Sequence, residues 1–151
     1  MRNASIEIQA APKTIFEYMT DPKHLKSWQP DVVEPRPLPP GGLQVGAHVG
    51  ATVEEYGRRF DVDLCVAAMT RNQHIAYKME APTVSGLVEY RLVQWGEHTR
   101  VVSRVMMQPK GFLRRVGPLL QGLLQGMMNR MAQRKMRSRL QLLRNALENH
   151  A

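Results

Sequence analysis

Two glutamates and three tyrosines are the residues of this chain whose types and positions could do chemistry in an apolar site. Glu54, Glu55 and Tyr56 are consecutive, while Tyr77 and Tyr90 alternate with polar residues in two other segments. A tyrosine that points into an apolar pocket offers a hydroxyl that can orient a ligand. A glutamate in such a pocket would have a raised pKa and could serve as a base. The pattern around the glutamates does not decide which of the two faces inward.

No set of nucleophile, base and orienting group can be recognised in the sequence, so no catalytic residue is assigned and catalysis stays an alternative. The histidines show no spacing typical of metal ligands, and only His24 and His48 lie near the expected mouth of a cavity. Cys65 is the single cysteine, which excludes an intramolecular disulfide and a cysteine-based zinc site. Cys65 alternates with apolar residues, which would place it facing outward or into an interface, but we favour a buried, inert thiol. We expect neither a metal nor a cofactor.

The methionines favour a pocket with an irregular shape. The chain has 10 of them, and four lie between Met127 and Met136. Unbranched thioether side chains adapt to irregular shapes, although a methionine stripe on a helix can equally be ordinary core. We predict that at least two of the following line a pocket: Met79, Met107, Met127, Met128 and Met131.

The elements that would position these residues follow from the hydropathy pattern. Apolar and polar residues alternate through most of residues 43–108, which predicts an antiparallel meander with one apolar face. Before it, Ile6 and Ile8 predict a strand, Pro12 predicts the start of a helix, and Trp28 the end of a second, short helix. Several strands are longer than the usual ~5–6 residues, and long strands twist and curl.

The C-terminal part of the chain is expected to be one long helix. The proline-rich residues 35–42 indicate a loop, whereas the pattern is helical from Gly111 to about Glu148, with a kink or restart at Gly117-Pro118. A curled sheet with one apolar face needs a cover, and only this helix is long enough to provide it. The two short helices would then close the open end of the sheet.

This order of elements, and four stretches within it, resemble a known superfamily. The stretches are SIEIQAAPKTIFEYMTDPKHLKSWQPDV at the start, LQVGA before the third strand, EYRLV late in the sheet and LQLLRNALE at the end. They resemble the START-related, Bet v 1-like (SRPBCC) proteins, specifically the polyketide cyclase/dehydrase and lipid-transport branch, over nearly the whole chain. The resemblance implies an α+β helix-grip fold in a single domain, residues 1–151. In that fold a curled antiparallel sheet of about seven strands surrounds the long C-terminal helix.

The resemblance also implies a cavity between sheet and helix that holds an apolar small molecule, such as a lipid, quinone or polyketide. We expect the walls to come from the apolar strand faces, from one side of the helix and, at the rim, from Trp28. The strand residues are Phe60, Leu64, Tyr77, Met79, Tyr90, Leu92 and Met107, and the helix residues are Leu120, Leu124, Met127, Met128 and Met131.

The net charge of +8 is confined to the C-terminal segment. Residues 110–151 contain nine lysines and arginines and a single acidic residue, Glu148, whereas the preceding residues are balanced. Like charges four residues apart oppose helix formation, so we expect acidic neighbours or an anionic partner. The available acidic cluster is Glu54, Glu55, Asp61 and Asp63.

Phe112 is the only aromatic residue near these cations, which disfavours nucleic-acid binding and favours weak, salt-dependent contact with an anionic membrane. The front half of the helix is apolar over more of its circumference than a sheet can cover. Because Ala67, Ala76 and Val102 add small apolar groups to the outer sheet face, we also expect a homodimer. No apolar run reaches the ~20 residues of a membrane span and the N-terminus lacks a signal-peptide pattern, so we expect a cytoplasmic location.

Three functions are open. The leading hypothesis is a carrier or sensor that binds an apolar small molecule under the long helix. The second is a polyketide cyclase- or dehydratase-like enzyme, and the third is a membrane-peripheral protein that presents a lipid or quinone. Inward-facing histidine, glutamate or arginine would favour the enzyme, and a purely apolar cavity would favour the carrier.

Overall fold

The computed structural model describes residues 2–110 and 117–149, so the expected helical residues 111–116, with Phe112, lie outside the described residues. The elements, in chain order, are β1 (Arg2–Ile8), α1 (Pro12–Thr20), the 3-10 helix η1 (Pro22–His24), α2 (Leu25–Trp28), β2 (Val32–Pro35), β3 (His48–Glu55), β4 (Arg58–Thr70), β5 (His74–Glu80), β6 (Val84–Trp95), β7 (His98–Pro109) and α3 (Pro118–Asn149).

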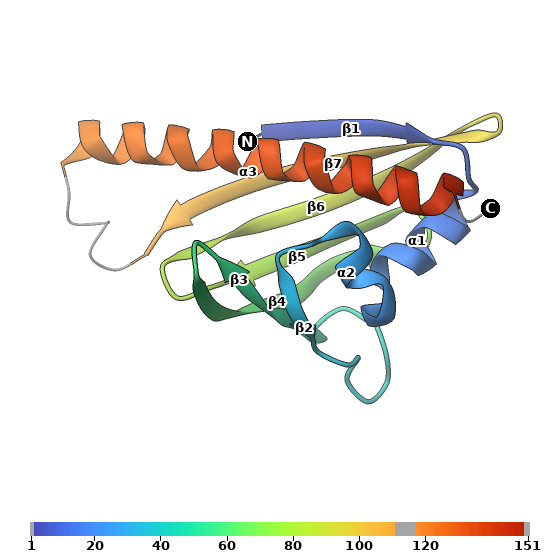
Figure 1. Ribbon diagram of the computed structural model, residues 1–151, viewed down its shortest axis with the longest axis horizontal. Coiled ribbons are helices and arrows are strands. Elements are labelled where there is room, and N and C mark those ends of the chain that lie inside the picture. The colour runs from blue at the N-terminus through green and yellow to red at the C-terminus, as the bar shows by residue number, and fades with distance from the viewer. Residues whose placement is uncertain (1, 111–116, 150–151) are drawn as a thin grey trace.

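The seven strands form one antiparallel sheet in the order β1-β7-β6-β5-β4-β3-β2. This confirms the predicted meander and the prediction that the first strand joins it. β4, β6 and β7 span 13, 12 and 12 residues, and strands of this length twist and curl. Figure 1 shows the sheet curved beneath α3, with α1 and α2 close to the C-terminal half of that helix.

Two glycines allow neighbouring strands of the sheet to approach closely. A Cβ atom at Gly50 in β3 would collide with the carbonyl oxygen of Val62, and one at Gly86 in β6 would collide with the carbonyl oxygen of Met106. Only glycine fits a strand at such a close backbone approach. Any other residue at these two positions would force the backbone of the neighbouring strand to shift.

A β-bulge in β4 reverses the alternation of side chains partway along the strand. The register against β5 shifts between Val66 and Ala68, so Ala67 is an extra residue on the bulged strand. Val66 is buried in the core, but beyond the bulge Met69, and not Ala68, packs against it. The alternation predicted for residues 43–108 is therefore interrupted at this bulge, and the apolar face passes from Val66 to Met69.

The rear half of α3 covers the concave face of the sheet, as predicted. Met136, Leu140 and Leu143 recur at helical spacing and are buried in the main core. α1 begins at Pro12 and buries Phe16 in the same core. The two elements together enclose the space above the central strands.

The front half of α3 contacts the sheet through polar side chains instead. Gln125 Nε2 donates to the Met107 carbonyl oxygen at 3.3 Å, and the Met107 amide donates to Asn129 Oδ1 at 3.2 Å. In Figure 1 the first turns of α3 extend past the N-terminal end of β1. Five of the seven large apolar residues of this half are exposed: Leu119, Leu120, Leu123, Met127 and Met131. Among the described residues, no helix combines the length and the apolarity that a membrane span requires.

Candidate functional site

A cavity of about 210 Å³ lies between the concave face of the sheet, the rear half of α3 and the segment of α1 and α2. Its wall includes Met19 and Met136 beside two of the five methionines named from the sequence, Met79 and Met107. Trp28 lines the cavity but is only 2% exposed, so it lies inside and not at the rim where we expected it. Eight of the residues expected in the wall line it: Trp28, Phe60, Leu64, Tyr77, Met79, Tyr90, Leu92 and Met107.

The residues of α3 that line the cavity are not those that we expected. None of the following lines the cavity: Leu120, Leu124, Met127, Met128 and Met131. The side of this half that meets the sheet carries Gln125 and Asn129, which leaves Leu120, Met127 and Met131 48%, 58% and 52% exposed. The helix reaches the cavity only further on, with Ala132, Lys135, Met136 and Arg139.

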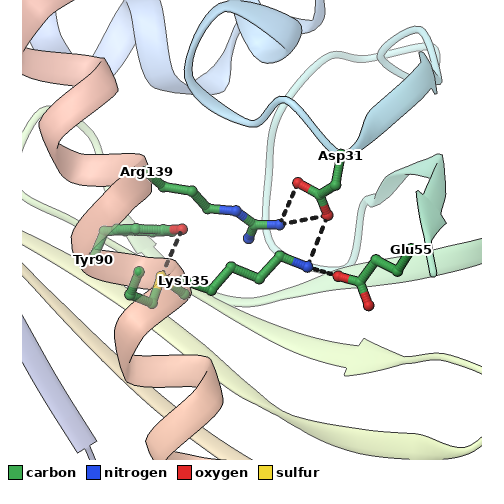
Figure 2. Close-up of polar contacts among 6 residues, drawn as sticks. Asp31, Glu55, Tyr90, Lys135 and Arg139 are labelled. Carbon is green, nitrogen blue, oxygen red and sulfur yellow. Dashed lines mark hydrogen bonds and ion pairs between the residues drawn. The ribbon is translucent and has the colours of Figure 1, made fainter.

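A cluster of four charged side chains borders the cavity, and Figure 2 shows how they converge from three elements. Arg139 Nη2 donates to both carboxylate oxygens of Asp31 at 2.9 Å. Lys135 Nζ lies 2.9 Å from Asp31 Oδ2 and also contacts Glu55 Oε1. Lys135 and Glu55 keep 39% and 31% of their side chains exposed, so the cavity reaches the surface at this cluster.

This cluster resolves the ambiguity between the two glutamates. Glu55 lines the cavity, whereas Glu54 lies on the other face of β3 and pairs with Arg59, with 3.2 Å between Oε2 and Nε. Of the four acidic residues expected near the basic helix, only Glu55 contacts it among the described residues. Asp61 and Asp63 lie close to Arg36 instead.

Asp31 was missed by the sequence reasoning. It follows Pro30 in the short connection between α2 and β2, where no periodic pattern assigns it to a face. Its partners Lys135 and Arg139 were seen only as part of a basic run. The sequence did contain a signal for these two cations. Lys135 directly precedes Met136 and Arg139 directly precedes Leu140, so both cations flank the side of α3 that is buried against the sheet.

The ionisation states in the wall follow from burial and from neighbouring charges. Burial alone would raise the pKa of Asp31, but the charge of Arg139 and the hydrogen bonds from Lys135 and Arg139 outweigh it and hold that pKa below its ordinary value. Burial, helped by the charge of Arg139, lowers the pKa of Lys135. Burial raises the pKa of Tyr77 and of Tyr90, so both hydroxyls stay protonated and can donate.

The two histidines expected near the mouth do not line the cavity. His24 stacks on Tyr18 with ring centroids 4.3 Å apart, and His48 Nδ1 lies 3.0 Å from Asp63 Oδ2 on the outer face. Cys65 is only half-buried, because it occupies the outward position of β4 beside His48, and not the buried one that we expected. Within residues 2–110 and 117–149 no three metal-ligand side chains gather in one place.

Comparisons with known proteins agree with this architecture. A family model described as polyketide cyclase / dehydrase and lipid transport matches residues 3–148. No curated protein matches the chain. A START superfamily protein from Mycobacterium smegmatis is similar in structure, with a TM-score of 0.64, 16% identity, and coverage of 94% of this chain and 97% of that one.

Two further solved structures share the fold. The Aha1 dimer from Colwellia psychrerythraea has a TM-score of 0.62 and 17% identity, with 97% of this chain and 94% of that chain covered. DynU16, from the dynemicin biosynthetic locus, has a TM-score of 0.65 and 16% identity; the match covers 97% of this chain but only 46% of DynU16. At these identities the structures show the fold alone. The match to the family model over residues 3–148, on a seven-stranded sheet covered by a long C-terminal helix, shows that the chain belongs to the polyketide cyclase/dehydrase and lipid-transport family.

Proposed function

We propose that this protein binds a compact, largely apolar small molecule in the cavity, as a carrier or sensor. The observation that carries the proposal is a cavity of about 210 Å³ walled mainly by apolar side chains. Because the cavity reaches the surface at Lys135 and Glu55, water can enter it, but its mostly apolar wall offers that water few hydrogen-bond partners. Apolar surface that stays in contact with water forgoes roughly 25 cal/mol of stability per Å². Larger side chains could fill the space, so its retention supports a binding role.

The size of the cavity limits the ligand. A dry cavity of ~150 Å³ takes up benzene, whereas sites for drug-sized ligands measure ~300–1,000 Å³. A cavity of about 210 Å³ therefore suits one or two rings, or one end of a longer molecule whose remainder leaves past Lys135 and Glu55. A polyketide of many fused rings would require the cavity to widen.

The test is mass spectrometry of small molecules released when the purified protein is denatured. The matched control is Ala132→Phe, since Ala132 lines the cavity from α3 and a phenyl group there would occupy the space. We expect the parent to release a bound molecule and the variant to release much less, while the variant unfolds at the same or a higher temperature. Release of equal amounts from both proteins, or failure of the parent to take up any apolar bicyclic probe, would argue against the cavity as the binding site.

A cyclase- or dehydratase-like reaction is the alternative, because Glu55 and Lys135 border the same cavity. The low pKa of Asp31 makes that carboxylate a weak proton acceptor at neutral pH, so Glu55 is the better candidate base. The two functions differ in what happens to the ligand. Turnover that Glu55→Gln abolishes without loss of binding would favour the enzyme, and a ligand recovered with unchanged mass favours the carrier.

A membrane-peripheral role is favoured by a separate observation on α3. The exposed apolar side of its front half is followed by Arg130, Arg134 and Arg137, which are exposed and form no ion pair with any of the described residues. A helix with apolar side chains and arginines at its surface suits the interface of an anionic bilayer. A second copy would instead bring two chains of charge +8 together, so we favour the lipid surface, and the homodimer stays a prediction.

Sedimentation with vesicles tests this second role. We expect retention on vesicles that contain anionic lipid, weaker retention at high salt, and loss of retention when Leu123 and Met127 are both changed to glutamine. Gln141→Ala, on the exposed side of the rear half, is the control and should leave retention unchanged. A doubled mass in light scattering that the glutamine variant abolishes would assign the surface to a homodimer, and retention of DNA or RNA without vesicles would assign it to nucleic acid.

A further inference from the structure

Two hydrogen-bond donors in the wall of the cavity have no acceptor among the described residues. Trp28 Nε1 and Arg139 Nε are buried and have no partner among the described residues, and both side chains line the cavity. An unsatisfied buried donor costs roughly 1–3 kcal/mol, and such groups are rare in native structures. Two of them in the wall of one cavity call for an explanation.

Two hydroxyls in the same region share a single weak acceptor. The Tyr90 hydroxyl donates to Met136 Sδ at 3.7 Å, and Ser103 Oγ donates to the same sulfur at 3.1 Å (Figure 2 draws the first of these contacts). A thioether sulfur accepts hydrogen bonds only weakly. The rings of Tyr90 and Trp28 meet edge to face with centroids 6.0 Å apart, so the phenol and the indole are neighbours in the cavity wall.

One acceptor at the cavity, the carboxylate of Asp31, is already engaged with two cations of α3. The carboxylate of Asp31 receives two hydrogen bonds from Arg139 and a further contact from Lys135. The charged side chains of the wall also balance. Three cations, Arg36, Lys135 and Arg139, stand against three anions, Asp21, Asp31 and Glu55. An anionic ligand would therefore find no surplus positive charge and would lie close to two carboxylates.

We propose that the ligand is a neutral molecule with a carbonyl-type acceptor, as in a ketone, ester, amide or quinone, and that this acceptor binds where Trp28, Tyr90 and Arg139 border the cavity. The inference rests on the proposed small-molecule binding and adds the chemical class of the ligand. A carbonyl oxygen has two lone pairs, so one such group can accept from two of the donors at once. The apolar remainder of the ligand would occupy the methionine-rich part of the wall.

The test uses three probes with one bicyclic frame: tetralin without an acceptor, 1-tetralone with a ketone, and 1,2,3,4-tetrahydro-1-naphthoate with a carboxylate. Trp95 is exposed and is the other of the two tryptophans, so in a Trp95→Phe background the fluorescence reports on Trp28 alone. We expect 1-tetralone to bind about tenfold more tightly than tetralin, because one net hydrogen bond to a buried donor increases the affinity by about this factor. The carboxylate should bind more weakly than the ketone.

Two variants locate the acceptor. Tyr90→Phe and Trp28→Phe each remove a donor and keep an aromatic ring, and calorimetry compares both probes on each variant. We expect the advantage of 1-tetralone over tetralin to fall by about threefold or more in each variant, with a smaller change in the affinity for tetralin.

The outcomes separate this inference from the proposed function. Equal binding of tetralin and 1-tetralone by the parent would overturn the acceptor and leave the cavity as a binding site. Tightest binding of the carboxylate would overturn the neutral class. Binding of none of the three, by a protein with a folded circular dichroism spectrum, would count against the cavity function and with it against this inference.

Discussion

Arg139 contacts both carboxylate oxygens of Asp31 with a single nitrogen, Nη2, at 2.9 Å each. The pair joins α3 to the connection between α2 and β2, two segments separated by 108 positions in the chain. Both side chains are largely shielded from water, with 17% and 14% exposed. The Asp31–Arg139 ion pair therefore holds α3 close to the segment that borders the opening of the cavity.

Removal of one side chain of this pair should lower the stability of the protein. We expect Asp31→Asn and Arg139→Gln each to lower the free energy of unfolding by about 1–3 kcal/mol, less than for a fully buried pair because the cluster reaches solvent. The double variant should lose less than the sum of the two, since neither charge is then left alone. Urea unfolding of the four proteins measures this coupling, and additive losses would show that the two side chains act independently.

The same pair predicts a pH dependence of stability. The pKa of Asp31 is held below its ordinary value of 3.8, so the stability contributed by its ionised form is fully present above that value and is lost as the pH falls through the lower, folded-state pKa. Between roughly pH 5 and pH 2 the parent should therefore lose more stability than Asp31→Asn. Guanidinium unfolding at several pH values compares the two slopes, and parallel slopes would mean that Asp31 is not the responsible carboxylate.

The fold could be predicted from the sequence because its signals are periodic. Period-two strands and the stripe of Met136, Leu140 and Leu143 specify a sheet with one apolar face and a helix that covers it. Periodicity also groups Leu120 with Met127, but it shows only that they share a face. It does not show whether that face has a neighbour, so the helix wall was placed too early along α3.

Other features leave no local signal. The bulge at Ala67 has no special residue to mark it, and β2 is only four residues long. Asp31 is an isolated aspartate whose partners lie in the last helix. The charged end of the cavity depends on these long-range contacts, so the pattern of apolar residues could predict the apolar walls but not the polar cluster.

The hydroxyl of Tyr90 should contribute little to stability in the absence of a ligand. Its only partner among the described residues is the sulfur of Met136, so Tyr90→Phe should change the free energy of unfolding by no more than about 0.5 kcal/mol. Tyr90→Ala removes a buried ring and should cost about 3–5 kcal/mol. Thermal and urea unfolding measure both, and a large loss in the phenylalanine variant would reveal a stronger partner for the hydroxyl.

The two halves of α3 should respond differently to one substitution. Leu143 is fully buried, whereas Leu123 is 62% exposed. We expect Leu143→Ala to cost about 2–5 kcal/mol and Leu123→Ala to change stability by less than about 0.5 kcal/mol. Unfolding at two protein concentrations checks this. A large loss at Leu123 that grows with protein concentration would mean that another copy covers this side of the helix.

The contacts between α3 and Met107 have a consequence for the way in which copies of this chain meet. β1 pairs with β7 only as far as Val105, so beyond that residue no strand among residues 2–110 lies on this side of β7. Asn129 accepts from the Met107 amide and Gln125 donates to its carbonyl, as the backbone of an adjacent strand would. An unpaired strand edge is a template on which another chain can add and begin an aggregate. By occupying that edge with two amide side chains, the front half of α3 protects the protein from edge-to-edge association, whatever the cavity holds.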